Sequence, residues 1–242
     1  MNIRFRYSAM LRMAVAATII SVCSLWTAAQ TAPTQHFELK LRDFTELKVV
    51  DGINVDYVCS ADSAGYAVFD ALPELAPKIM FEPSGDRLTI QLLNDEGPLH
   101  NLPTIKVYSR YLQSVENDGD SLVRALSVAP IPKFKAKLVG NGRLSVRDVD
   151  ANEVKATLLT GNGTITITGR CTEAILQATS TGTITADQLV ATEVKCRLAG
   201  TSTIGCAPTE KLQVRGMAGK VLYKGKPAIN KSFALGVKVE PF

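Results

Sequence analysis

The chain has 242 residues, which allows one or two domains, and its 27 basic and 23 acidic residues give a small positive net charge. Three of the basic residues fall within residues 1–29, so the remainder carries 24 − 23 = +1. This near-neutral balance, with no basic stripe interleaved with aromatic residues, argues against a nucleic-acid binding protein.

Residues 1–29 are typical of a secretory signal peptide. A basic start with three arginines precedes an almost wholly apolar run at 14–26, and small residues at 27–29 offer a cleavage site. The run is shorter than the roughly 20 residues of a transmembrane helix, and we expect no transmembrane span in the mature chain. The protein should therefore be exported to the periplasm or the cell surface. Anchoring as a lipoprotein through Cys23 is a second interpretation, because residues 20–23 partly match a lipobox.

The mature chain keeps four cysteines: Cys59, Cys171, Cys196 and Cys206. An exported protein can oxidise them. Their spacings match no zinc pattern, and the two histidines are far apart in the sequence, so we expect no metal and no other cofactor.

Residues 30–110 are expected to form an amino-terminal β-region. Runs with β-branched or aromatic residues at alternating positions indicate its strands: 47–50, 54–59, 67–69, 88–93 and 105–108. Between the first two runs, Gly52 is expected to provide a turn, because glycine tolerates positive φ. Ile53 and Val55 would then point into the core, and Asn54 would point away from it.

Residues 111–229 carry an internal repeat, and 230–242 are expected to form a tail or a final strand. Five turns separate short strands, with glycine in each: 140–142, 161–163, 180–182, 200–202 and 216–218. Their first residues are 21, 19, 20 and 16 positions apart. A period near 20 residues, built from strand and turn, is typical of a stack of coils in which each coil buries the face of the next.

Aligning the turns predicts which side chains face inward, because side chains alternate between the two faces of a strand. Three inward sets follow: Leu144, Ile165, Ile184 and Ile204; Val146, Ile167, Ala186 and Cys206; and Leu138, Leu159, Ala178, Leu198 and Val214. The positions between them point outward and are rich in threonine: Thr164, Thr166, Thr183, Thr185 and Thr203.

The threonine array is the candidate binding face. A flat, regular set of hydroxyl groups could bind a glycan or ice. The alternative is structural, because threonine suits exposed strand positions and pairs well across strands. Arg143 interrupts the array at its first coil and Gly205 at its last.

We therefore expect an all-β fold, a right-handed coiled-strand (β-solenoid) protein whose amino-terminal β-region packs on or caps the coils. Cys196 and Cys206 both occupy inward positions, each five residues from Thr201. A chain reversal near Thr201 would bring them opposite one another. They would then form either a structural disulfide or two buried thiols that pack as small apolar residues.

The segment 50–55 contains the tripeptide Gly-Ile-Asn, and the strands at 105–108 and 112–115 and then the glycine-centred turns follow it. In this order the chain resembles the bacterial head GIN domain family, described as autotransporter-adhesin heads, over about residues 43–226. The resemblance implies an exported, all-β, coiled-strand protein of the bacterial envelope. It implies no catalytic residues.

The acidic residues of the repeats fall mainly at the corners of the coils, and we expect no carboxylates paired on adjacent coils, as a glycosidase would need. The acidic cluster at 116–120 could hold calcium, although a solvated turn explains it as well. The sequence thus predicts a non-catalytic binding or adhesion module for an unknown surface ligand, glycan or protein. The alternatives are a polysaccharide-processing β-helix enzyme and a purely structural envelope protein. A homo-oligomer stays open.

Overall fold

The computed structural model describes residues 33–93 and 101–242, so the expected signal peptide and Cys23 lie outside the described residues. Residues Gln35–Phe242 form one compact unit. Its strands belong to a single coiled sheet, and a short 3-10 helix, η1 (Ala76–Lys78), precedes one of them. The part of the chain that the structure describes has no helix of the length and hydrophobicity that a membrane span requires.

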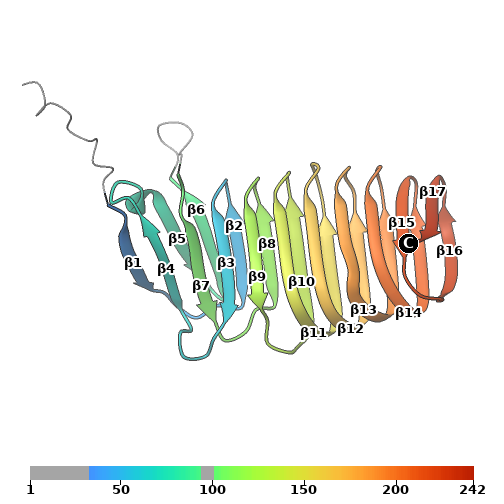
Figure 1. Cartoon of the computed structure of the whole chain (residues 1–242), viewed down its shortest axis with the longest axis horizontal. Helices are drawn as coiled ribbons and strands as arrows, with labels where there is room; N and C mark the ends of the chain where they lie inside the picture. The colour runs from blue at the N-terminus through green and yellow to red at the C-terminus, as the bar shows by residue number, and fades with distance from the viewer. Residues whose placement is uncertain (1–32, 94–100) are drawn as a thin grey trace, which may run out of the picture. The chain divides into compact units, whose positions relative to one another are not determined.

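The strands follow one another along the chain as β1 (Gln35–Lys40), β2 (Glu46–Val50), β3 (Asn54–Cys59), β4 (Tyr66–Ala71), β5 (Ile79–Ser84), β6 (Arg87–Leu92), β7 (Thr104–Ser109), β8 (Ser114–Asp118), β9 (Leu122–Ser127), β10 (Ile131–Val139), β11 (Arg143–Leu158), β12 (Thr164–Ala178), β13 (Thr183–Leu198), β14 (Thr203–Gly216), β15 (Gly219–Tyr223), β16 (Ala228–Ala234) and β17 (Val237–Pro241). Figure 1 shows them side by side along the length of this unit.

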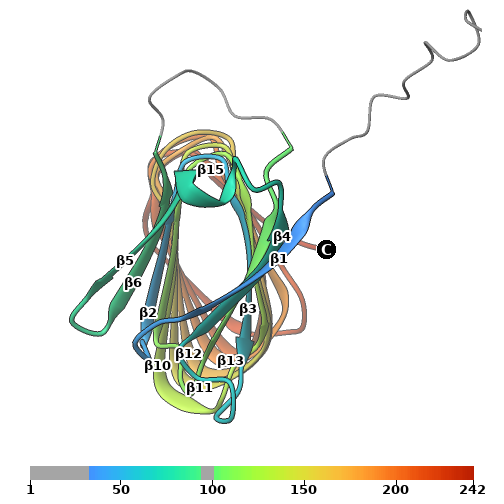
Figure 2. The same ribbon diagram turned by 90° about the vertical axis from the view of Figure 1, so that its left-hand side faces the viewer.

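The expected β-solenoid is confirmed, and each of its coils has two walls joined by turns, which Figure 2 shows in cross-section. β11 bends between Val146 and Val149: its first half pairs in parallel with β9 and its second half with β10. β12, β13 and β14 pair with their neighbours in the same two halves. We name the two walls after the residues on their outer surfaces. The threonine wall contains β7, β3, β9, the first halves of β11–β14, β15 and β17. The arginine wall contains β6, β2, β8, β10, the second halves of β11–β14 and β16.

The coils are not stacked in sequence order at the amino-terminal end. β2 pairs with both β6 and β8, and β3 pairs with both β7 and β9. The β2–β3 coil, which carries the Gly-Ile-Asn tripeptide, therefore lies between two coils that follow it in the chain. Beyond β6 and β7 the pairing becomes antiparallel, through β5 on one wall and β4 and β1 on the other. These antiparallel strands close that end of the stack, whereas β16 and β17 form the last coil at the other end.

The interior is a continuous apolar core, and the inward sets predicted from the turns are buried with one exception. Leu144, Ile165 and Ile184 expose at most 1% of their surface. Each such side chain contributes roughly 1.5–3 kcal/mol when its neighbours cover it. The exception is Leu159: Leu158 pairs with both neighbouring coils and is fully buried, while Leu159 already belongs to the turn.

The turn of the Gly-Ile-Asn tripeptide also differs from the prediction. The left-handed residue is Asp51, with φ 67°, and not Gly52. Aspartate tolerates this conformation, and the Asp51 carboxylate accepts the Leu92 backbone N–H at 3.0 Å, which ties the turn to the neighbouring coil. Ile53 is fully buried as expected, and Asn54 turns its side-chain oxygen to the Leu122 N–H at 2.9 Å.

Later turns need glycine because successive coils touch through their backbones. A Cβ atom on Gly182 would lie 2.2 Å from the carbonyl oxygen of Gly163, and one on Gly163 would lie 2.7 Å from that of Gly142. These contacts are shorter than any side chain allows, so the repeated glycine is a requirement of stacking.

Candidate functional site

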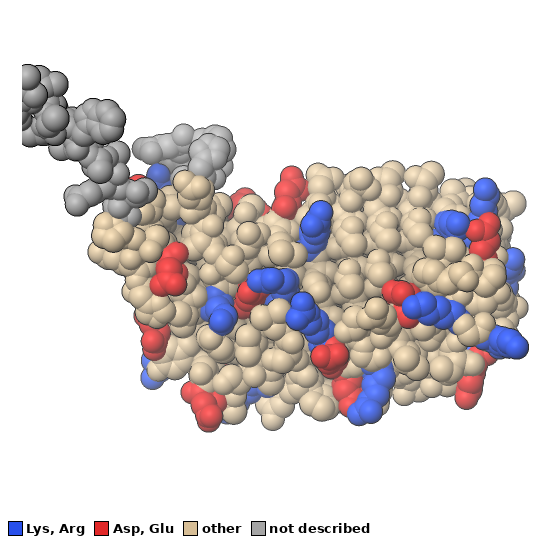
Figure 3. Space-filling view, viewed as in Figure 1, with Lys and Arg blue, Asp and Glu red and all other residues tan. Residues whose placement is uncertain are grey.

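The five threonines expected as a binding face lie on one wall, in two columns across neighbouring coils: Thr164, Thr183 and Thr203, and Thr166 and Thr185. All five are half-buried. Arg143 precedes the first column and Lys220 follows it. Figure 3 shows this wall, with an area free of charged side chains over β12 and β13. The array is thus a regular, uncharged surface that can offer hydroxyl groups, with charges only at its ends.

The second threonine column ends at Gly205, where an aromatic side chain covers the strand. A Cβ atom at Gly205 would lie 3.0 Å from the ring of Phe242. The backbone N–H of Phe242 donates to the Tyr223 carbonyl at 3.1 Å, and the Lys224 ammonium lies 5.3 Å from the ring centroid. Glycine therefore interrupts the threonine column at position 205 because a side chain there would crowd the ring of Phe242.

The two cysteines expected as a disulfide candidate face one another across the interior. Cys196 belongs to the arginine wall and Cys206 to the threonine wall, and each is only 1% exposed. Neither is in a disulfide in this structure, and the Cys206 thiol donates to the Leu222 carbonyl at 3.6 Å. The Cys206 thiol and burial raise the pKa of Cys196 well above its ordinary value. The disulfide itself stays a prediction.

The acidic residues at the corners are arranged differently from the expectation. Three glutamates are in register on adjacent strands of the arginine wall: Glu153, Glu173 and Glu193. The expectation of no paired carboxylates on adjacent coils is therefore wrong, although the 20-residue spacing of the three matches the repeat. Each glutamate is in an ion pair with a lysine: Glu153 with Lys133 at 3.3 Å, Glu173 with Lys195, and Glu193 with Lys211 at 3.8 Å.

The side chains of the acidic cluster at 116–120 point in different directions, because most of the cluster lies on strand β8. Glu116 and Asp118 lie on the outside of β8, 3.4 Å and 3.1 Å from the ammonium of Lys48. Asn117 points inward and is fully buried, and its amide donates to backbone carbonyls. Asp120 accepts a backbone N–H of the next turn at 3.0 Å. Within residues 33–93 and 101–242, no three acidic, histidine or cysteine side chains converge on a common point where a metal could bind.

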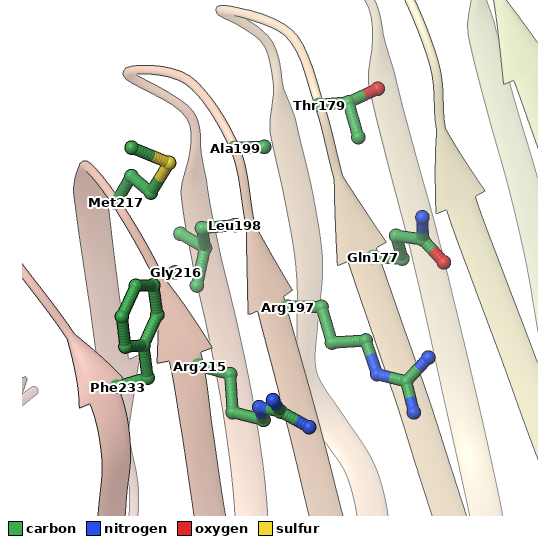
Figure 4. Close-up of a pocket in the computed structure, with 9 residues that line it drawn as sticks. All are labelled: Gln177, Thr179, Arg197, Leu198, Ala199, Arg215, Gly216, Met217 and Phe233. Carbon is green, nitrogen blue, oxygen red and sulfur yellow. The ribbon is translucent and has the colours of Figure 1, made fainter.

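The arginine wall contains a surface groove that the sequence does not predict. It has a volume of about 380 Å³, spans the ends of β12, β13 and β14, and is bordered by β16. Gln177, Arg197 and Arg215 lie along it on successive strands, with Met217 and Phe233 at its carboxy-terminal side. Figure 4 shows the two arginine side chains extending side by side toward Gln177, while the ring of Phe233 stands near Gly216. We name this site the arginine groove.

A β-bulge positions the aromatic side of the groove. Val214 pairs with Lys231, but Gly216 pairs with Ala234, so β16 has one more residue than β14 between these pairs. Phe233 lies in the bulge with φ 56°, in the left-handed region, and the residue is 65% exposed. Bulges re-aim side chains, and this one turns an aromatic ring outward where the preceding strands present arginine.

Little in the sequence indicates this groove. Arg197 and Arg215 are 18 residues apart, which differs from the 20-residue spacing of the glutamates Glu153, Glu173 and Glu193 on the same wall. Phe233 follows the last predicted turn, in the segment expected to be a tail or a final strand. Its left-handed conformation is rare for a residue with a large side chain and cannot be inferred from the residue type.

The family of the chain is decided by a match over most of its length. The family model described as "Putative auto-transporter adhesin, head GIN domain" matches residues 43–227. The chain belongs to this family. The match includes the inserted β2–β3 coil, the threonine columns and the coils of the arginine groove, and it ends just before β16 and Phe233. The groove is therefore only partly inside the head GIN domain.

Solved structures share this head GIN domain fold. An adhesin, named as putative, from Bacteroides fragilis NCTC 9343 has a TM-score of 0.78 at 18% identity, covering 86% of this chain and 97% of the other. A second one from Parabacteroides distasonis ATCC 8503 has a TM-score of 0.71 at 20% identity, covering 88% and 98%. A protein from the same organism named as a "Putative lipid binding protein" has a TM-score of 0.67 at 20% identity, with the same coverage.

The TM-scores of 0.67–0.78 establish a shared fold. At identities near 20%, they do not establish a shared ligand. The search of curated proteins found no match. The family and the two adhesin names nevertheless agree with a role in binding, and none of the three names describes a reaction.

Proposed function

We propose that this head GIN domain protein is a non-catalytic binding or adhesion module of the bacterial cell envelope. The observation that carries the proposal is a contrast on its outer surface. Carboxylates that could act on a substrate are bonded to lysines, as Glu173 is to Lys195. Hydroxyl groups, by contrast, form an open array on the threonine wall. Catalysis needs titratable groups that converge on one substrate atom, whereas binding needs only many contacts on an accessible face.

Its location follows from the amino-terminal sequence. A basic start, an apolar run and small residues within 1–29 support export, and the family name describes a cell-surface protein. We propose the periplasm or the cell surface as its compartment. Attachment through Cys23 as a lipoprotein is the second choice for how it is held there.

Retention on ligand arrays tests the binding function. The full-length protein, attached in many copies to beads, is exposed to neutral polysaccharides, acidic polysaccharides and envelope proteins. We expect retention of at least one of these classes, with weak affinity for single copies and stronger retention when several copies act together. Protein that retains nothing in the multivalent format would contradict the proposal. Biotinylation of intact cells that produce the protein tests whether it reaches the surface.

One observation favours a second function, a polysaccharide-processing enzyme. Glu153, Glu173 and Glu193 stand in a column on adjacent coils, and neighbouring carboxylates are the groups that glycosidases use. The test is incubation with neutral and uronic-acid polysaccharides, with and without calcium, followed by assays for reducing ends and unsaturated products. Under the favoured proposal no product forms. Sustained product formation that Glu173→Gln abolishes would establish the enzyme instead.

A further inference from the structure

The two arginines of the groove form an arrangement that the fold does not require. Arg197 and Arg215 are directly in register on β13 and β14, so their backbones lie about 4.8 Å apart. Both are exposed, and among the residues that the structure describes neither guanidinium takes part in an ion pair. Like charges directly opposite on neighbouring strands repel one another. An anion between the two guanidinium groups would convert this repulsion into attraction.

Elsewhere in the same outward row the charges alternate in sign. Lys48, Glu116 and Lys137 are in register on β2, β8 and β10, and Glu116 lies 3.4 Å and 3.0 Å from the two ammonium groups. The row then becomes neutral until Gln177 and ends in the two arginines. The groove is therefore the place on this row where positive charge has no ion-pair partner among the described residues.

The backbone also keeps an apolar side chain exposed to solvent at one side of the groove. Phe233 has a left-handed conformation that residues with side chains rarely adopt, and the bulge presents its ring to solvent at 65% exposure. Met217, at 66% exposure, lies beside it in the groove. The two apolar side chains line one end of the groove, and the two guanidinium groups extend toward the other end. A ligand with an anionic group and an apolar face that lies along the groove would contact both.

We infer that the arginine groove binds a carboxylate-bearing sugar residue of an acidic glycan, a ligand class that rests on the proposed binding function. A guanidinium group binds a carboxylate through two parallel N–H···O bonds, and Arg197 and Arg215 offer two such groups. The C–H face of a sugar ring packs on the ring of Phe233. Gln177 provides an amide for the hydroxyl groups of the sugar. The volume of about 380 Å³ suits a ligand of this size.

The depth of the groove favours a sugar over the acyl chain of a lipid. The residues beneath it, Leu198 and Val214, are 3% and 0% exposed and fill the interior of the coils. An acyl chain would find no apolar space below the arginines. A sugar with a carboxylate can bind to the surface of the groove without entering the interior, because the groove has polar residues along one edge and apolar residues along the other.

Calorimetric titration of the full-length protein with oligogalacturonate tests the inference. The methyl ester of the same oligosaccharide is the matched neutral probe. We expect oligogalacturonate to bind and the ester to lose nearly all of this affinity. The double variant Arg197→Gln/Arg215→Gln should bind at least about tenfold more weakly, because charge-assisted hydrogen bonds are lost. The variant Arg197→Lys/Arg215→Lys keeps the charge but not the planar forks, and should also bind more weakly.

The control variant is Arg143→Gln/Arg147→Gln, which removes the same charge from exposed positions of β11 outside the groove, one on the threonine wall and one in the bend. Its affinity should change by less than about threefold, since separated surface charges are screened by salt. Phe233→Ala should weaken binding of oligogalacturonate without changing its dependence on salt. Thermal unfolding of every variant shows that each still folds.

Each other outcome overturns the inference in a recognisable way. An equal loss of affinity in the groove variant Arg197→Gln/Arg215→Gln and in the control variant Arg143→Gln/Arg147→Gln would show that the protein attracts any polyanion through its overall charge. Binding to vesicles of phosphatidylglycerol, lost in the groove variant, with no binding of oligogalacturonate, would identify a membrane surface as the ligand. Retention of a neutral glycan or a protein that the groove variants leave unchanged would reject the groove and leave the proposed function standing. Retention of nothing on any array would reject both.

Discussion

The two walls share the four long strands β11–β14 but differ in how regular their outer surfaces are. On the threonine wall, one coil repeats the next, and Thr164, Thr183 and Thr203 occupy equivalent positions. On the arginine wall, the outward row passes from paired lysines and glutamates to two unpaired arginines and then to a bulge with Phe233. Stacking explains a surface in which every coil is alike. It does not explain a surface that changes along the stack, and such a change is where a ligand is to be sought.

The first prediction concerns the difference between the inside and the outside of the threonine wall. Ile184→Asp should lower the free energy of unfolding by about 4 kcal/mol or more, because it places an unpaired charge in the core. Thr183→Asp, one residue earlier and half-buried on the outside, should cost about 1 kcal/mol or less. Chemical denaturation of both variants gives the comparison. Equal losses would show that the wall has no distinct inner face.

The second prediction concerns the link between the two walls. In protein recovered from an oxidising compartment, Cys196 and Cys206 should be at least partly joined in a disulfide. The bond would close a short loop and contribute up to about 3 kcal/mol, less if its geometry is strained. Peptide mapping without reductant detects it, and the loss of stability on reduction measures it. Two free, alkylatable thiols in the unfolded, unreduced protein would contradict this prediction.

Much of the fold is predictable because a solenoid repeats one local rule. The glycine turns mark the ends of the strands, and alternation then gives the buried side chains, such as Ile165 and Ile184. The rule fails at Leu159, because five residues (159–163) separate β11 from β12 while four (179–182) separate β12 from β13. One extra turn residue shifts the register, and only the pairing of whole strands shows which turn is longer.

The stacking order and the groove could not be predicted in this way. The β2–β3 coil is inserted between later strands, and no local pattern records which distant strand a segment will pair with. The groove combines Arg197 and Arg215 with Phe233 from a bulge outside the repeat. Its geometry depends on one extra residue in β16, and the sequence around Phe233 does not distinguish a bulge from a regular strand.

The third prediction tests whether the bulge stores strain. Phe233→Gly should raise the free energy of unfolding by about 1 kcal/mol, because a left-handed residue with a side chain is strained and glycine is not. Phe233→Leu keeps the side chain and the strain, and should not be stabilising. Thermal unfolding of the two variants separates the backbone effect from loss of the ring. A destabilised glycine variant would show that the ring supports the coil and is not held outward at a cost.

The smallest expected effect is the most specific to the arginine wall. Arg215→Gln should raise stability by a few tenths of a kcal/mol, because it removes a like charge opposite Arg197. Lys137→Gln, in the same outward row, removes a lysine 3.0 Å from Glu116 and should lower stability by a similar amount. Added salt should shrink both differences, since it screens repulsion and attraction alike. Urea unfolding at low and high ionic strength measures them. If both variants shift stability in the same direction, the two arginines are ordinary surface charges, and the contrast between the paired and unpaired parts of this wall has no energetic basis.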